Sequence, residues 1–251
     1  GNLIAIVQTN IKRMLAYSSV ENMGIIALGI GIGLLGLSYQ ASTLATLGFA
    51  GALLHVLNHS IFKSLLFLGA GTVRHACGTN RLDEMGGLLK RMPWMSGAFL
   101  TGCVAIASLP PLNGFVGEYL IYLGAFEAEV ALPSLAAAPA LIVIGGLALI
   151  GGLAAACFTK VFGVVFLGAA RSESAANSKP PKLLMVLPML MLAPLCLIIG
   201  LASPLLLTWM EPIVSVPTGL PTAAVVEALQ PVVGSLSSIV LASVLLMVLI
   251  G

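Results

Sequence analysis

The chain consists of long apolar blocks separated by short polar segments. A helix that crosses a bilayer needs about 20 consecutive apolar residues. Six blocks satisfy or approach that length, at 16–37, 43–73, 94–126, 139–168, 183–207 and 232–250. The third is interrupted by the sequence Leu109-Pro110-Pro111-Leu112-Asn113-Gly114. The pattern therefore predicts an all-α polytopic integral membrane protein with about six transmembrane helices, one of them discontinuous. The short apolar run 3–7 is interpreted as the end of one further helix, which begins outside this sequence.

Composition agrees with this class. Hydrophobic residues make up 59% of the 251 positions and charged residues only 8%, whereas a soluble domain carries about 25% charged residues. So few charges cannot cover a water-facing surface, which argues against a soluble enzyme, a disordered chain or a nucleic-acid-binding protein. A membrane β-barrel is excluded as well, because its strands alternate in polarity and these blocks are continuously apolar.

The basic residues between the blocks predict the orientation. They precede the first block or follow the second and fourth, as Lys12, Arg13, Arg74, Arg81, Lys90, Arg91, Arg171, Lys179 and Lys182. The segments after the first, third and fifth blocks contain no lysine or arginine. Basic loops of membrane proteins lie in the cytoplasm, so these segments are expected on the cytoplasmic side. The alternation holds only if the third block crosses the membrane once, as a single discontinuous helix.

Six titratable residues lie inside the apolar blocks. A charge at the centre of a bilayer costs about 2.5–3.5 kcal/mol on insertion scales, so such residues usually face a bundle interior or a water-filled path and have a function. These residues are Glu21, His55, His59, Lys63, Glu118 and Lys160.

Three of these residues share one helix face. His55, His59 and Lys63 are spaced four residues apart, which places them along one side of a helix over about 12 Å. Histidine exchanges protons near neutral pH, and a buried lysine can act as a switchable charge. The spacing therefore favours a proton relay over the alternative, in which the histidines only bond to neighbouring helices and Lys63 extends towards the membrane surface.

The remaining three residues carry weaker signals. Glu118 follows the interruption at Pro110–Gly114, and broken helices are the usual device for ion sites in transporters; the alternative is a glutamate at the membrane interface. Glu21 can pair with a basic group from another segment. Lys160 lies nearer the cytoplasmic end of its block, so it belongs either to the proton path or to the membrane surface.

Four segments carry a family resemblance: IKRMLAYSSVENMGI at 11–25, HVLNHSIFKSLLFLGAG at 55–71, DEMGGLLKRMPW at 83–94 and SLPPLNGFVGEYL at 108–120. They resemble the antiporter-like proton-pumping membrane subunits of the complex I and membrane-bound hydrogenase superfamily. Within it, they are most similar to the branch of hydrogenase-4 component B and formate hydrogenlyase. The resemblance implies that residues 1–168 form the second of the family's two antiporter-like helical repeats, without the N-terminal repeat. A cytoplasmic linker at 169–182 and additional transmembrane helices at 183–251 would then follow.

The resemblance also implies a role and a location. The chain is expected to conduct protons through its buried lysine, histidine and glutamate residues, as a subunit of a redox-driven complex in a bacterial or archaeal cytoplasmic membrane. We expect no cofactor and no metal in this chain, with iron–sulfur, NiFe or quinone chemistry in partner subunits. Other membrane subunits and the lipid bilayer are the expected partners, and nucleic acid is not. Two alternatives remain open: a cation/proton (Na⁺/H⁺) antiporter subunit of the same fold, and a membrane anchor that transports nothing.

Overall fold

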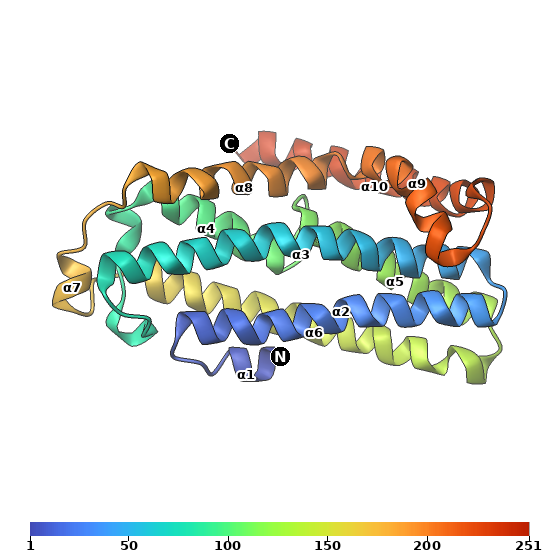
Figure 1. The fold of residues 1–251 in the computed structure, drawn as a ribbon, viewed down its shortest axis with the longest axis horizontal. Coiled ribbons are helices and arrows are strands. Elements are labelled where there is room, and N and C mark those ends of the chain that lie inside the picture. Colours follow the sequence, from blue (N-terminus) through green and yellow to red (C-terminus); the bar gives the residue numbers. More distant parts are fainter. Residues whose placement is uncertain (251) are drawn as a thin grey trace. The chain divides into compact units, whose positions relative to one another are not determined.

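The computed structural model describes residues 1–250, and all its elements are helices (Figure 1). Gly251, the last residue of the predicted C-terminal range, lies outside the described residues. Two of the elements, η1 and η2, are single 3₁₀ turns. In chain order the helices are α1 (Asn2–Ala5), α2 (Ile11–Ser38), α3 (Ser42–Cys77), η1 (Leu82–Glu84), η2 (Leu88–Lys90), α4 (Pro93–Ile106), α5 (Asn113–Ala131), α6 (Ser134–Phe166), α7 (Glu173–Ala176), α8 (Leu183–Leu201), α9 (Ser203–Thr218) and α10 (Thr222–Ile250).

The expected all-helical membrane fold is confirmed. Within the described residues, five helices are long and apolar enough to span a bilayer: α2, α3, α6, α8 and the Thr222–Leu246 part of α10. The shorter apolar helix α4 accompanies them. Helices α2 and α3 extend beyond the apolar blocks that predicted them at both ends, and α6 begins five residues before its block and ends two residues before the block does.

The predicted break in the third block is present. Helix α4 ends at Ile106 and α5 begins at Asn113. Neither Pro110 nor Pro111 has an N–H group to donate to a helix, and the peptide bond between them is cis. Ser108 adopts a positive φ of 53°, which ends helical geometry for a residue with a side chain. The number of times that this block crosses the membrane stays a prediction.

The C-terminal region corrects the sequence-based boundaries. The fifth predicted block, 183–207, is divided at Ala202 between α8 and α9, and α10 begins ten residues before the predicted start at 232. The polarity of 208–231 concealed these helices. Leu207 and Val214 of α9 are buried with Val225 and Leu229 of α10 in one apolar cluster. Both helices therefore extend beyond the apolar blocks, because one apolar face is enough to pack a helix and a continuous apolar run is not needed.

The chain forms two compact units, to each of which α2, α3, α6 and α8 contribute residues. The first contains Gly1–Asn22, His59–Ala107 and Ile150–Cys196, and the second contains Met23–Asn58, Ser108–Leu149 and residues 197–250. These units do not coincide with the predicted ranges 1–168, 169–182 and 183–251, because each unit contains residues from two or more of them. The assignment of a repeat, a linker and additional helices to those ranges stays a prediction.

Small residues bring the helices of the second unit together. A Cβ atom on Gly48 of α3 would collide with the backbone of Gly33 and Gly29 of α2. Close approach of helix backbones at glycines is typical of membrane helices. Figure 1 shows α2 and α3 side by side along this contact.

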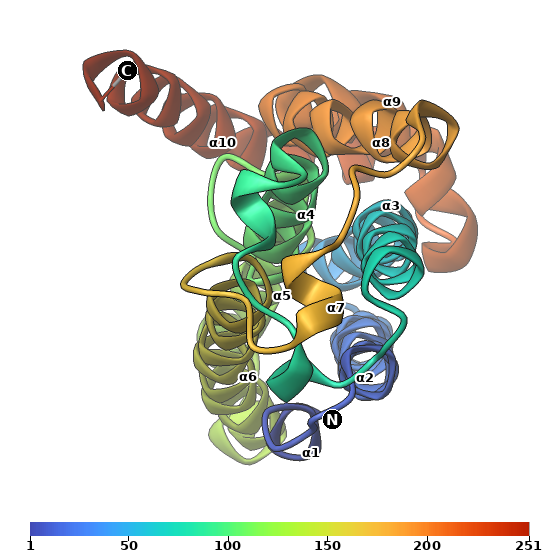
Figure 2. The same ribbon diagram turned by 90° about the vertical axis from the view of Figure 1, so that its left-hand side faces the viewer.

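In the first unit, the segment 169–182 is held against the loop that follows α3. Ser172 Oγ donates to the Glu84 carbonyl at 2.7 Å, and the Arg171 guanidinium donates to the Met85 carbonyl at 3.1 Å. Gly86 has a φ of 138°, and a Cβ there would collide with the Ala169 carbonyl. Figure 2 shows α7, which lies in this segment, beside that loop. The predicted linker is therefore anchored and partly buried.

Candidate functional site

Lys63 is the centre of a polar site in the first unit. Its side chain is only 5% exposed. The Nζ atom donates to the Leu15 carbonyl at 2.8 Å and to Ser18 Oγ at 2.5 Å. Ser18 Oγ in turn donates to the same Leu15 carbonyl at 3.0 Å. The hydroxyl thus uses its proton on the carbonyl and offers a lone pair to the lysine.

These hydrogen bonds are compatible with both charge states of Lys63. An ammonium group carries three N–H donors, and a neutral amine carries two. The Leu15 carbonyl and Ser18 Oγ accept two hydrogen bonds from Nζ, so the same geometry can hold either form. The remaining hydrogen of the ammonium group is the one that can leave without breaking these two contacts.

Glu21 lies one turn beyond Ser18 on α2, and α1 packs against it. Glu21 is 7% exposed, and its Oε1 accepts a hydrogen bond from Asn2 Nδ2 at 2.5 Å. The same Asn2 nitrogen donates to the Ile150 carbonyl of α6 at 3.1 Å. The N-terminal segment thus links the glutamate to α6 within the first unit.

Lys160 is held differently from Lys63. It is exposed, and its Nζ donates to the Ile6 carbonyl at 2.6 Å. The structure therefore places Glu21 and Lys160 against the same N-terminal segment, Asn2 to Ile6. Nothing in the order of residues along the chain indicated that shared environment.

His59 and His55 lie on α3 with Lys63 but have different surroundings. His59 is half-buried and lies edge-on to Phe62, with ring centroids 5.6 Å apart. Its buried Nε2 has no hydrogen-bond partner within residues 1–250. His55 is fully buried in the second unit. A Cβ on Gly117 of α5 would lie 2.9 Å from the Cβ of His55, so only a glycine there allows α5 to pack against the histidine.

Glu118 follows Gly117 and is also buried, at 7% exposure. Its Oε1 accepts a hydrogen bond from Ser108 Oγ at 2.5 Å. Ser108 is the residue with positive φ in the break, and such conformations in residues other than glycine are concentrated at functional sites. The break thus supplies a hydroxyl donor to the carboxyl group, as well as interrupting the helix.

Two asparagines join α3 to the start of α5 beside this site. Asn58 Nδ2 donates to the Asn113 carbonyl at 2.7 Å, and Asn113 Nδ2 donates to the Asn58 carbonyl at 3.5 Å. Both residues are fully buried. Asn58 is therefore bonded to Asn113, the residue at which α5 begins after the break.

Comparison with known proteins identifies the family. Residues 1–145 match the family model described as NADH:quinone oxidoreductase/Mrp antiporter, TM. The chain belongs to this family of multi-pass integral membrane proteins. It is 42% identical over 221 residues to formate hydrogenlyase subunit 3 of Escherichia coli, covering 88% of this chain and 36% of that protein. It is 41% identical over 255 residues to hydrogenase-4 component B of the same organism, covering 100% of this chain and 37% of the relative.

The structural comparison agrees. An archaeal respiratory membrane complex, the membrane-bound sulfane sulfur reductase, contains a chain that is 26% identical and matches with a TM-score of 0.69, covering 84% of this chain and 31% of that chain. The resemblance seen in the four sequence segments is thereby confirmed. This chain of the NADH:quinone oxidoreductase/Mrp antiporter family spans little more than a third of the curated relatives it matches.

The sequence pattern did not identify several residues that form hydrogen bonds to the titratable groups of the site. Ser18 stands between Tyr17 and Ser19, and from the sequence any of these hydroxyls could equally satisfy a helix end. Asn2 and Ser108 carry no feature that singles them out. Neutral polar side chains are inexpensive in a membrane compared with charges, so they do not stand out from an apolar block. A signal was available for Ser18, which lies three residues before Glu21, whereas Asn2 and Ser108 are each ten residues from the nearest charged residue.

Proposed function

We propose that this chain conducts protons as part of the membrane portion of a larger redox-driven complex. The observation that carries the proposal is Lys63, a buried amine held by the Leu15 carbonyl and Ser18 Oγ in a geometry that accepts both of its charge states. A lysine that served only as a fixed surface charge would have its amine in water or in an ion pair. Membership of the NADH:quinone oxidoreductase/Mrp antiporter family supports the same role.

We assign the other titratable residues to the same path. His59 and His55 extend the relay along α3, and Glu118, hydrogen-bonded to Ser108, is the exchange site towards the outside. Glu21 and Lys160, which contact the N-terminal segment through Asn2 and Ile6, modulate the charge around Lys63. Histidine and buried carboxyl groups are the usual members of proton relays in membranes.

The redox chemistry is proposed to reside in partner subunits. The relatives named above are subunits of hydrogenase and formate hydrogenlyase systems. We therefore propose other membrane subunits as partners, with iron–sulfur, NiFe or quinone groups outside this chain. The same likeness supports a bacterial or archaeal cytoplasmic membrane, and the distribution of the basic residues supports placing their loops in the cytoplasm.

A second candidate is a cation/proton antiporter subunit, because the matching family model covers Mrp antiporters as well as quinone oxidoreductases. A sodium site requires several oxygen ligands together. In the second unit, Glu118 is bonded to Ser108, and the side-chain nitrogens of Asn58 and Asn113 are engaged with each other's carbonyls. The side-chain oxygens of Asn58 and Asn113 are buried without a hydrogen-bond partner within residues 1–250, so oxygen atoms that could serve a cation are present, and the sodium dependence of transport distinguishes the two candidates.

The decisive experiment replaces Lys63 by arginine in the full-length protein within its complex. Arginine stays protonated at all physiological pH values, so Lys63→Arg retains the charge and removes the ability to switch it. We expect at least a tenfold loss of proton uptake into vesicles that contain equal amounts of assembled complex. Lys90→Arg, at an exposed position at the end of η2, is the matched control and should transport like the wild type.

Three results would contradict parts of this proposal. Wild-type proton uptake by an assembled Lys63→Arg complex would remove the switch role from Lys63. Proton movement that requires sodium, and is abolished in its absence, would establish the antiporter candidate. If the wild-type complex has redox activity but translocates no charge, the chain is a membrane anchor that transports nothing.

A further inference from the structure

A hollow of about 650 Å³ lies at one end of the first unit, and the proton path does not use it. All its lining residues belong to that unit. They come from the start of α2, the last turns of α3 with the following Gly78, and the start of α8. Its floor is Gly71 of α3, where an added Cβ would meet no atom within 4 Å. The missing side chain thus leaves open space on the face of α3, between α2 and α8.

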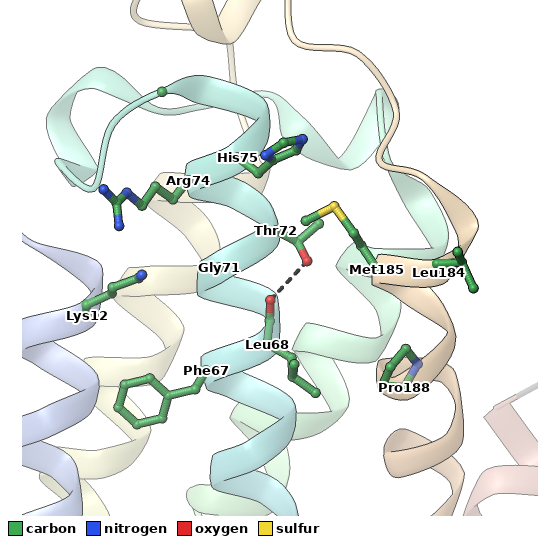
Figure 3. Close-up of a pocket in the computed structure, with 11 residues that line it drawn as sticks. Lys12, Phe67, Leu68, Gly71, Thr72, Arg74, His75, Leu184, Met185 and Pro188 are labelled. Atoms are coloured by element: carbon green, nitrogen blue, oxygen red, sulfur yellow. Dashed lines mark hydrogen bonds between the residues drawn. The ribbon is translucent and has the colours of Figure 1, made fainter.

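The polar part of the lining is basic. Lys12, Arg74 and His75 line the hollow, and none of its described lining residues is acidic. Figure 3 shows Lys12 and Arg74 extending into the space between α2 and α3, and His75 on the other side of α3. The ion pairs of the described residues are those of Arg81 with Asp83 and Glu84, so no carboxylate within residues 1–250 neutralises Lys12 or Arg74.

Apart from Thr72 and the glycines, the rest of the lining is apolar. Phe67 and Leu68 lie one to two turns before Arg74 on α3, and Leu184 and Pro188 lie on α8 (Figure 3). Leu184 is 82% exposed, Leu68 39% and Phe67 38%. Basic groups at the helix ends with an exposed apolar wall beside them match a molecule that has a negative head and a hydrocarbon tail.

We propose that this hollow binds an anionic phospholipid, with its phosphate between Lys12 and Arg74 and its acyl chains along Phe67, Leu184 and Pro188. Lys12 is the second residue of α2, and Arg74 lies in the last turn of α3. The basic groups therefore lie where the spans end, at the depth of the headgroups. Basic pockets between membrane helices on the cytoplasmic side bind anionic headgroups. A free phosphate ion would leave the apolar wall exposed.

The test uses the full-length protein in its complex, reconstituted in nanodiscs with phosphatidylglycerol that carries a photoreactive group in one acyl chain. After illumination, labelled peptides are quantified by mass spectrometry. We expect labelling of the peptides that contain residues 67–75 and 184–188. Each lysine or arginine near an anionic surface contributes about 1 kcal/mol. Lys12→Gln and Arg74→Gln should therefore each reduce labelling about fivefold at limiting lipid.

Two further variants separate binding from general damage. Gly71→Leu places a side chain on the floor of the hollow, where an added Cβ meets no atom within 4 Å, and should reduce labelling. Gly145→Leu makes the same change at a position of α6 where an added Cβ is equally free, and it should not. Arg13→Gln removes an exposed charge next to Lys12 that does not line the hollow, so its labelling should equal that of the wild type.

The alternatives give different results. Equal labelling by phosphatidylcholine with the same photoreactive chain would show non-selective boundary lipid and overturn the proposal. Complete competition by millimolar inorganic phosphate would show a site for the free anion instead. Absence of labelling in the assembled complex would also overturn the proposal. Each outcome is independent of proton transport, so the proposed function and this site can fail separately.

Discussion

The individual polar residues inside the helices differ in how they are stabilised. Lys63 relies on one backbone carbonyl and one hydroxyl, and Glu118 relies on a serine in a strained turn. Ser18 and Ser108 thus act as the immediate partners of the two central titratable groups. Because a buried donor or acceptor without a partner costs about 1–3 kcal/mol, these serines are the residues through which the site can be weakened without changing its charges.

Ser18→Ala tests the support of Lys63. The substitution removes the 2.5 Å hydrogen bond to Nζ, and we expect the free energy of unfolding to fall by about 1–3 kcal/mol, measured by thermal unfolding of the purified full-length protein. Ser19→Ala is the matched control. Ser19 Oγ bonds to the same Leu15 carbonyl at 3.2 Å, but it makes no hydrogen bond to the lysine, so its loss should have a smaller effect. Equal effects would show that Ser18 only caps the Leu15 carbonyl.

Glu118→Gln tests the carboxyl group as a proton site. Glutamine keeps the size of the side chain and can still accept from Ser108, but it cannot exchange a proton. We expect assembly to be retained and proton uptake into vesicles to fall at least tenfold, while Glu118→Asp should retain part of the activity. Glu129→Gln, at an exposed position on the same helix, should leave uptake unchanged. Wild-type uptake by Glu118→Gln would limit this residue to a structural role.

Among the secondary-structure elements, the break between α4 and α5 depends on a neighbouring helix. Gly200 of α8 lies so close to the break that a Cβ atom there would collide with the Pro111 carbonyl. The contact is between backbones, which cannot give way as a flexible side chain can. Helix α8 thus covers the interrupted segment in the second unit, where the freed peptide groups would otherwise face lipid.

Gly200→Ala should therefore destabilise the protein. Overpacking of this kind costs about 1–3 kcal/mol, and it should appear as a lower thermal unfolding midpoint of the full-length protein in detergent. Gly234→Ala, in α10, meets no atom within 4 Å, and it should be neutral or slightly stabilising because alanine is the better helix former. If both variants unfold at the wild-type temperature, α8 does not hold the break.

For the whole molecule, orientation in the membrane follows from the distribution of basic residues. Their restriction to alternate loops requires the α4–α5 block to cross once. If that block instead formed a hairpin, 127–133 would lie on the same side as the basic loops, and the bias would disappear. The orientation therefore tests the single crossing directly.

Cysteine labelling measures this orientation. In the full-length protein without its native cysteines, all four of which are buried in this chain, an impermeant thiol reagent applied from outside should modify Val130→Cys and spare Lys179→Cys. Val130 is 84% exposed, and Lys179 is also exposed, whereas the adjacent Ser178 is buried and would be protected on either side. Modification of both positions to the same extent would overturn the single crossing.

The sequence determined the membrane class, the long helices and the position of the break. These features depend on local chemistry: about 20 apolar residues must span the bilayer, and two consecutive prolines cannot donate helical hydrogen bonds. The cost of charge in a membrane likewise singled out Lys63, His55, His59, Glu118, Glu21 and Lys160. The roles of these six residues in transport stay predictions.

Only the tertiary structure decided what each of these groups contacts. Lys63 bonds to residues 45 and 48 positions away, and Asn2 reaches Ile150 over 148 positions. The boundaries of α9 and α10 were decided in the same way, by the burial of Leu207 and Val214 with α10. Such contacts depend on which helix faces meet, and the hydropathy of a single segment carries no information about its neighbour. The sequence therefore determined where charge is buried, and the packing of the helices determined which partners stabilise it.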